Sequence, residues 1–134
     1  MRSWIFAYVG AALAMLVLDG AWLSLAAKRL YRPLLGDMLA NGFRIAPAAL
    51  FYFLYVAGIV VLAVTPGLAA GKWTVALHRG LVLGLIAYGT YDLTNQATLR
   101  QWSTTVTIVD MVWGTILTGA AATAGYYAAR WAAA

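Results

Sequence analysis

Four apolar stretches, each about as long as a lipid bilayer is thick, constrain this chain more than any other feature. A helix needs about 20 mainly apolar residues to cross the roughly 30 Å hydrocarbon core. Stretches of that length run through residues 4–27, 46–65, 73–91 and 105–127. Backbone groups in lipid must be satisfied within the segment, and no stretch alternates like a barrel strand. The sequence therefore predicts an all-α fold, an integral membrane four-helix bundle that forms a single transmembrane domain over residues 1–134.

The composition agrees with a membrane protein and excludes other classes. Hydrophobic residues make up 64% of the chain, charged residues 10%, and the mean hydropathy is +0.82. A soluble domain of 134 residues could not cover so much apolar surface. The net charge of +5 comes from basic residues at the ends of apolar stretches. Contacts with membrane lipids explain them, so we expect no nucleic-acid partner.

The first span and the basic residues indicate how the chain crosses the membrane. Met1 and Arg2 precede an apolar run, as in a secretory signal, but this run is longer and carries Asp19 and Trp22. We therefore expect a retained first helix. Basic residues on the two sides of the membrane number five against four, with the excess on the side of the first connection. This count predicts a multi-pass protein of the cell inner membrane with both termini outside.

The first connection, from Lys28 to Ile45, allows two interpretations. Its apolar residues come at near-helical spacing beside basic ones: Leu30, Leu34, Leu35, Met38 and Leu39. This pattern indicates a short interfacial helix on the lipid headgroups. An irregular linker explains it equally well. Further along, Pro66 and Gly67 are expected to end the second span.

Three of the four acidic residues, Asp19, Asp92 and Asp110, lie within or beside the predicted spans, and glutamate is absent. A carboxylate at mid-bilayer costs roughly 2.5 to 3.5 kcal/mol, so such a residue suggests a function by default. Antiparallel neighbours put the end of the first helix, the end of the third and the start of the fourth on one side. At a rise of 1.5 Å per residue, Asp19 and Asp110 then lie roughly 8 to 12 Å below the same surface, with Asp92 just above them.

The predicted binding site joins these carboxylates to aromatic and polar residues at the same side. Its members are Asp19, Trp22, Tyr88, Tyr91, Asp92, Asn95, Arg100, Asp110, Trp113 and Gly114. The first and fourth helices both contain the motif Asp-x-x-Trp, which places an indole on the face that bears the carboxylate. The glycines of the third and fourth helices are in general explained by close helix packing.

Metal and nucleophile chemistry find little support in the sequence. The chain has one histidine, too few for a histidine-rich di-iron centre, and no cysteine. Asp19, Asp92, Asp110 and Asn95 would offer oxygen ligands to Mg²⁺, but no single motif contains paired carboxylates, so no metal site is predicted. The chain has no serine or cysteine nucleophile motif and no glycine-rich phosphate loop. The sequence identifies no cofactor.

The segment Tyr88–Leu99, followed by Trp102 and by Val109–Thr115, resembles a family of small bacterial membrane proteins. The family is catalogued as domain of unknown function 2177 and is predicted to have four spans. Leu18–Leu23 matches the same pattern, and the resemblance covers nearly the whole chain. It implies a bacterial membrane protein with four helices and says little about activity.

Three hypotheses for the function remain open. In the first, Asp19 and Asp110 form a protonatable pair that binds or translocates a small polar, cationic or lipid-like ligand, within a homo-oligomer if a conduit is needed. In the second, the protein is an enzyme acting on a lipid or isoprenoid-like substrate, with an Asp as general acid or base. In the third, it is an accessory subunit whose carboxylates pair with basic side chains of a membrane protein partner. We favour binding or translocation, with membrane lipids as neighbours, and leave open whether the protein is an enzyme.

Overall fold

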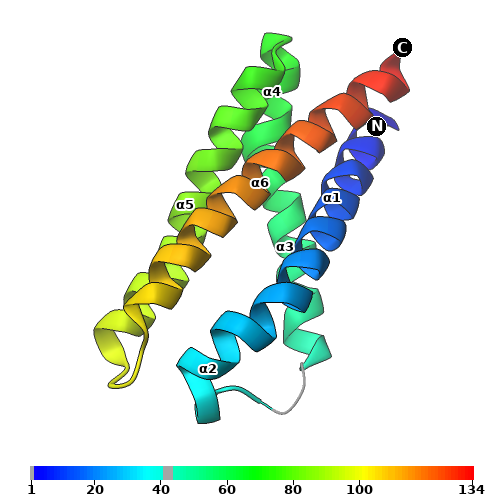
Figure 1. Ribbon diagram of the computed structural model, residues 1–134. Coiled ribbons are helices and arrows are strands. Elements are labelled where there is room, and N and C mark those ends of the chain that lie inside the picture. The colour runs from blue at the N-terminus through cyan, green and yellow to red at the C-terminus, as the bar shows by residue number, and fades with distance from the viewer. Residues whose placement is uncertain (1, 41–43) are drawn as a thin grey trace.

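The computed structural model describes residues 2–40 and 44–134, which form four long helical segments (Figure 1). The first comprises α1 (Arg2–Ala26), the π-helical turn η1 (Ala27–Tyr31), α2 (Arg32–Leu35) and the 3₁₀ turn η2 (Gly36–Met38). The second comprises α3 (Ile45–Ile59), the π-helical stretch η3 (Val60–Val64) and α4 (Thr65–Ala70), and the others are α5 (Trp73–Thr98) and α6 (Thr104–Ala133). No strand occurs in the described residues, so the predicted all-α membrane bundle is confirmed.

Three of these segments are long and apolar enough to cross a membrane. They are Arg2–Met38, Ile45–Ala70 and Thr104–Ala133. The helix α5 has 26 residues but is not among them, because His78 and Arg79 lie near its start and polar residues fill its last turns. Its role as a fourth crossing therefore stays a prediction.

The second segment does not end at Pro66 and Gly67, where the sequence pattern placed its end. The helix continues through η3 into α4, and Pro66 lies in the first turn of α4. Proline is tolerated at such a position because its ring is compatible with the first helical turn. The segment ends instead at Gly71, whose φ of +66° is in the left-handed region that favours glycine.

The first connection is helical from Ala27 to Met38, which fits the predicted short helix and not the irregular linker. It continues directly from α1. Leu35 is buried, and Gly36, with a φ of +53°, ends α2. Residues 41–43 of the same connection lie outside the described part of the chain.

The helix α6 is the central element of the bundle. Figure 1 shows it between α5 and α1, with α3 behind, and its most extensive contacts are with α5 and α1. Glycines allow these helices to approach closely. A Cβ at Gly84 of α5 would overlap the carbonyl oxygen of Gly114, and one at Gly10 of α1 would lie 2.6 Å from the Cβ of Ala128. The packing role predicted for such glycines is thus confirmed at Gly84.

Large apolar side chains cover the outside of the bundle. Val17, Ile45 and Phe53 are 69%, 78% and 66% exposed, respectively. The buried core, by contrast, consists largely of alanine and other small residues. Exposure of this apolar surface to water would be unfavourable, whereas contact with the hydrocarbon chains of lipids is not.

One end of the bundle collects the segments that carry the predicted site. In Figure 1, α2, the start of α3, the end of α5 and the start of α6 all lie at the lower end. The start of α6 is fixed by Ser103, whose Oγ accepts a hydrogen bond of 3.3 Å from the backbone N–H of Val106. This arrangement agrees with the one deduced from helix order.

Candidate functional site

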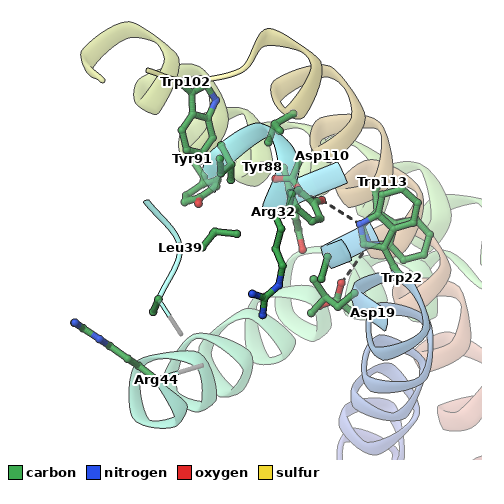
Figure 2. A pocket seen from close by; sticks show the side chains of 16 residues that line it. Asp19, Trp22, Arg32, Leu39, Arg44, Tyr88, Tyr91, Trp102, Asp110 and Trp113 are labelled. Carbon is green, nitrogen blue, oxygen red and sulfur yellow. Dashed lines mark hydrogen bonds between the residues drawn. The ribbon is translucent and has the colours of Figure 1, made fainter. Parts of the chain in front are cut away.

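A cavity of about 510 Å³ opens at this end of the bundle, between α1, α2, α5 and α6 (Figure 2). Its wall combines carboxylates, aromatic rings, arginines and aliphatic side chains. The residues are Asp19, Trp22, Leu23, Ala27, Tyr31, Arg32, Leu35, Leu39, Ala40, Arg44, Tyr88, Tyr91, Trp102, Val106, Asp110 and Trp113. Cavities of this size with a few polar groups in an apolar wall are typical of small-molecule sites.

The carboxylate of Asp19 is held by two donors from two other helices. The hydroxyl of Tyr52 on α3 donates to Oδ2, and the indole Nε1 of Trp113 on α6 donates to Oδ1 at 3.2 Å. Asp19 lies on α1, so this single group links three helices. Such hydrogen bonds offset the cost of placing a carboxylate away from water.

The carboxylate of Asp110 is held through the first connection. The hydroxyl of Tyr31 in η1 donates to Oδ1 of Asp110 at 2.7 Å and accepts a hydrogen bond of 3.1 Å from Nε1 of Trp22. The rings of Trp22 and Trp113 stack, with centroids 4.7 Å apart and planes inclined by 12°. Asp19 and Asp110 are therefore connected through two indoles and a phenol.

The two Asp-x-x-Trp motifs are cross-paired. Trp113, from the motif of α6, donates to Asp19 of α1. Trp22, from the motif of α1, serves Asp110 of α6 through the hydroxyl of Tyr31. The motif spacing places each indole one turn from its own carboxylate, so each ring can reach across the helix interface. The two copies of the motif thus form one connected set of hydrogen bonds and stacked rings between α1 and α6.

Asp92 lies behind the cavity wall. Its side chain is fully buried on α5, and neither carboxyl oxygen has a hydrogen-bond donor among the described residues. Its polar neighbour is the carboxyl group of Asp110. The acidic neighbour of Asp110 is thus Asp92. Asp19 has its own hydrogen-bond donors, Tyr52 and Trp113.

Two arginines from the first connection line the outer part of the cavity. Figure 2 shows the guanidinium group of Arg32 extending from the centre of the site and that of Arg44 pointing away from it, at the edge of the view. The side chain of Leu39 extends from the first connection toward the middle of the site. The cavity therefore has an acidic, aromatic inner wall and a basic, partly aliphatic rim.

The structure brings six of the ten predicted site residues into the cavity wall. These six are Asp19, Trp22, Tyr88, Tyr91, Asp110 and Trp113. The other four, Asp92, Asn95, Arg100 and Gly114, are not part of the wall. Gly114 has an indirect effect, since a Cβ there would overlap the ring of Tyr88 and push it from its place. Arg100 is exposed in the connection between α5 and α6.

Sequence reasoning did not select Tyr31, Arg32, Arg44, Tyr52 or Trp102 for the site. A signal existed for the arginines, because the first connection is the most basic one and helix order puts it on the side of the carboxylates. No comparable signal existed for Tyr52, a phenol inside an apolar span. Its contact with Asp19 depends on how α3 is rotated against α1.

Metal ligands are not grouped in the described part of the chain. Within residues 2–40 and 44–134, no three side chains of His, Cys, Asp or Glu are placed to hold a metal ion together.

Comparison with known proteins yields a family and no individual relative. A family model described as "Predicted membrane protein (DUF2177)" matches residues 4–127. No curated protein and no solved structure matches the chain. The matched range contains both Asp-x-x-Trp motifs and the whole cavity wall.

Proposed function

This chain belongs to the DUF2177 family of predicted membrane proteins, and we propose that it binds a small amphipathic molecule within the membrane. The polar part of the ligand would lie against Asp19 and Asp110, and its apolar part against the aliphatic wall. One observation carries the proposal: a cavity of about 510 Å³ combines two intramembrane carboxylates with a largely apolar lining.

The donors that hold the carboxylates support a binding role. Asp19 and Asp110 receive hydrogen bonds from phenol and indole groups, which are neutral. These bonds fix the positions of the carboxylates without cancelling their charge. A polar or cationic ligand group would therefore gain a favourable electrostatic interaction in a medium of low dielectric.

Binding accounts for this arrangement better than acid–base catalysis does. Both oxygens of Asp19 already accept hydrogen bonds, one from Tyr52 and one from Trp113. Each oxygen keeps a second lone pair, but the two donors fix the orientation in which Asp19 could reach a substrate proton. The carboxylate of Asp19, held in place by two hydrogen bonds, is therefore better suited to attract a ligand than to exchange protons with it.

Native mass spectrometry of the protein, purified from its own membranes in a mild nonionic detergent, tests the proposal. We expect a discrete adduct on the wild type. The double variant Asp19→Asn/Asp110→Asn should retain on the order of tenfold less of it, as expected for loss of about 1.4 kcal/mol of binding energy. At Asp110 the amide oxygen of Asn can still accept from Tyr31, and at Asp19 it can accept from Trp113 while the amide N–H donates to the hydroxyl oxygen of Tyr52, so the fold should persist.

The exposed Asp37 supplies a matched control, because Asp37→Asn makes the same chemical change outside the cavity. Equal adduct on the wild type and on both variants would place the ligand elsewhere. A bare wild-type mass would contradict the proposal. Mass spectrometry of the released adduct identifies its chemical class.

A further inference from the structure

We infer that the ligand is a zwitterionic amphiphile, with an ammonium group at the inner wall of the cavity and a phosphate-like group at its rim. This inference rests on the proposed function and specifies the ligand class. Three features of the structure carry it: the composition of the inner wall, the arginines of the rim and an apolar groove beside the site.

The inner wall has the chemistry of an ammonium site. The cavity that holds the carboxylates of Asp19 and Asp110 is also lined by six aromatic rings: Trp22, Tyr31, Tyr88, Tyr91, Trp102 and Trp113. Aromatic faces attract organic cations, and the effect grows when water is excluded. No basic side chain belongs to this inner group, so a ligand cation would supply the missing positive charge.

The rim has the opposite chemistry. Arg32 of α2 and Arg44 of the first connection line the cavity, but only the guanidinium group of Arg32 lies over the site, and that of Arg44, which points away, would have to turn toward a bound anion. Arg44 directly precedes α3, whose first turn has no side-chain cap, so the partial positive charge of that helix end adds to the arginine charges. Guanidinium groups bind phosphate oxygens in paired hydrogen bonds. An anionic group on the ligand therefore fits the rim.

An apolar groove extends from the site along the outside of the bundle. A second cavity of about 380 Å³ lies between α1 and α3, with Leu16, Ile45, Phe53 and Val56 in its wall. Tyr52 lies between the two cavities, because its ring lines the groove and its hydroxyl donates to Asp19. Ile45 in the groove wall directly follows Arg44 of the rim, so a chain bonded to the phosphate-like group can enter the groove from the rim. The exposed apolar residues of this groove face the lipid, so it suits the hydrocarbon chain of the same ligand.

An ammonium group at the inner wall and a phosphate-like group at the rim match a zwitterionic lipid headgroup. They also match a soluble zwitterion such as phosphocholine. The shared chemistry is an ammonium joined to a phosphate. The groove favours the membrane source, because a soluble zwitterion would leave it unused.

Defined probes test the inference in dodecyl maltoside micelles, with tryptophan fluorescence as the signal and native mass spectrometry to count bound molecules. The probes are dodecylphosphocholine, dodecyltrimethylammonium, dodecyl phosphate, the neutral 1-dodecanoylglycerol and free phosphocholine. At equal mole fraction in the micelle, we expect dodecylphosphocholine to bind about tenfold more tightly than either singly charged amphiphile.

Two double variants separate the charged ends. Asp19→Asn/Asp110→Asn should weaken dodecyltrimethylammonium and dodecylphosphocholine about tenfold and spare dodecyl phosphate. Arg32→Gln/Arg44→Gln should weaken dodecyl phosphate and dodecylphosphocholine about tenfold and spare dodecyltrimethylammonium. Asp37→Asn and Arg29→Gln are the matched controls, since both residues are exposed and outside the cavity wall.

The outcomes distinguish this inference from the proposed function. If 1-dodecanoylglycerol binds as tightly as dodecylphosphocholine, the zwitterionic ligand is overturned while amphiphile binding stands. If free phosphocholine binds as tightly as dodecylphosphocholine, the membrane source is overturned in favour of a soluble zwitterion. Failure of all four amphiphiles to bind would overturn the proposed function itself.

Discussion

At the scale of single residues, Asp92 shows a conflict between burial and hydrogen bonding. Its side chain is fully buried, yet both carboxyl oxygens are without a donor among the described residues. Its polar neighbour, the carboxyl of Asp110, has no hydrogen to offer when ionised. An unsatisfied buried polar group costs roughly 1 to 3 kcal/mol. An ionised Asp92 therefore lowers the stability of the bundle.

We expect Asp92→Asn to raise the thermal unfolding temperature. At a pH at which both carboxyl groups are ionised, the amide N–H of Asn can donate to Asp110 whereas Asp92 cannot, and the gain should be about 1 kcal/mol. Thermal unfolding in detergent, followed by circular dichroism, measures the change. Asp37→Asn, at an exposed site, should leave the temperature unchanged. A lower unfolding temperature for Asp92→Asn would show that a donor holds the Asp92 carboxylate.

Single residues of the site could be predicted from the sequence only where a charged side chain stands in an apolar stretch. Asp19 and Asp110 are conspicuous because carboxylates are rare in apolar spans. Tyr31 and Tyr52 have no such signature, and their hydrogen bonds depend on helix rotation. Asp92 was placed in the site by its position near the end of a span, but its side chain lies behind the wall.

At the scale of helices, the contact between α5 and α6 depends on the absence of a side chain at Gly84. We expect Gly84→Ala to destabilise the protein by about 1 to 3 kcal/mol, because the new methyl would overlap the backbone carbonyl oxygen of Gly114. Gly58→Ala is the matched control, since a Cβ there meets nothing within 4 Å. Thermal unfolding in detergent compares the two, and equal stability of both variants would contradict the observed packing.

Helix positions followed from hydropathy, whereas helix ends did not. Apolar length predicts where a helix must cross lipid, but a helix continues beyond the hydrocarbon wherever its backbone bonds are satisfied. Hence α5 runs to Thr98 and α6 to Ala133, beyond the predicted spans. The π-helical stretch η3 before Pro66 also leaves no clear trace in the sequence.

At the scale of the whole molecule, the number of crossings decides where the termini lie. Four crossings put both termini on one side and the connections that hold Asp37 and Gln101 on the other. The chain has no cysteine, so single reporters can be introduced without a background. A membrane-impermeant maleimide on intact cells should label Ser3→Cys and Ala134→Cys but neither Asp37→Cys nor Gln101→Cys.

Each alternative topology gives its own labelling pattern. Labelling of Asp37→Cys and Gln101→Cys alone would reverse the orientation. Labelling at only one terminus would mean that one helical segment, with α5 the first candidate, does not cross. Added detergent should expose all four positions, which controls for reactivity.

The sequence predicted best at which end of the bundle the acidic residues lie. Antiparallel order alone placed Asp19, Asp92 and Asp110 at one end of the bundle. It also put the basic first connection on the same side, but it could not show that Arg32 and Arg44 in particular line the cavity, because that depends on the path of the connection.

The cavity lies at one end of the bundle, and at the other end α1 and α6 pack closely against each other. There, Gly10 of α1 and Gly125 of α6 sit against neighbouring helices with no room for a methyl group. In a bundle that crosses the bilayer, a molecule in the cavity would exchange with the leaflet at that end. The protein would then sample the composition of that leaflet, and passage through the bundle to the other leaflet would require α1 and α6 to separate.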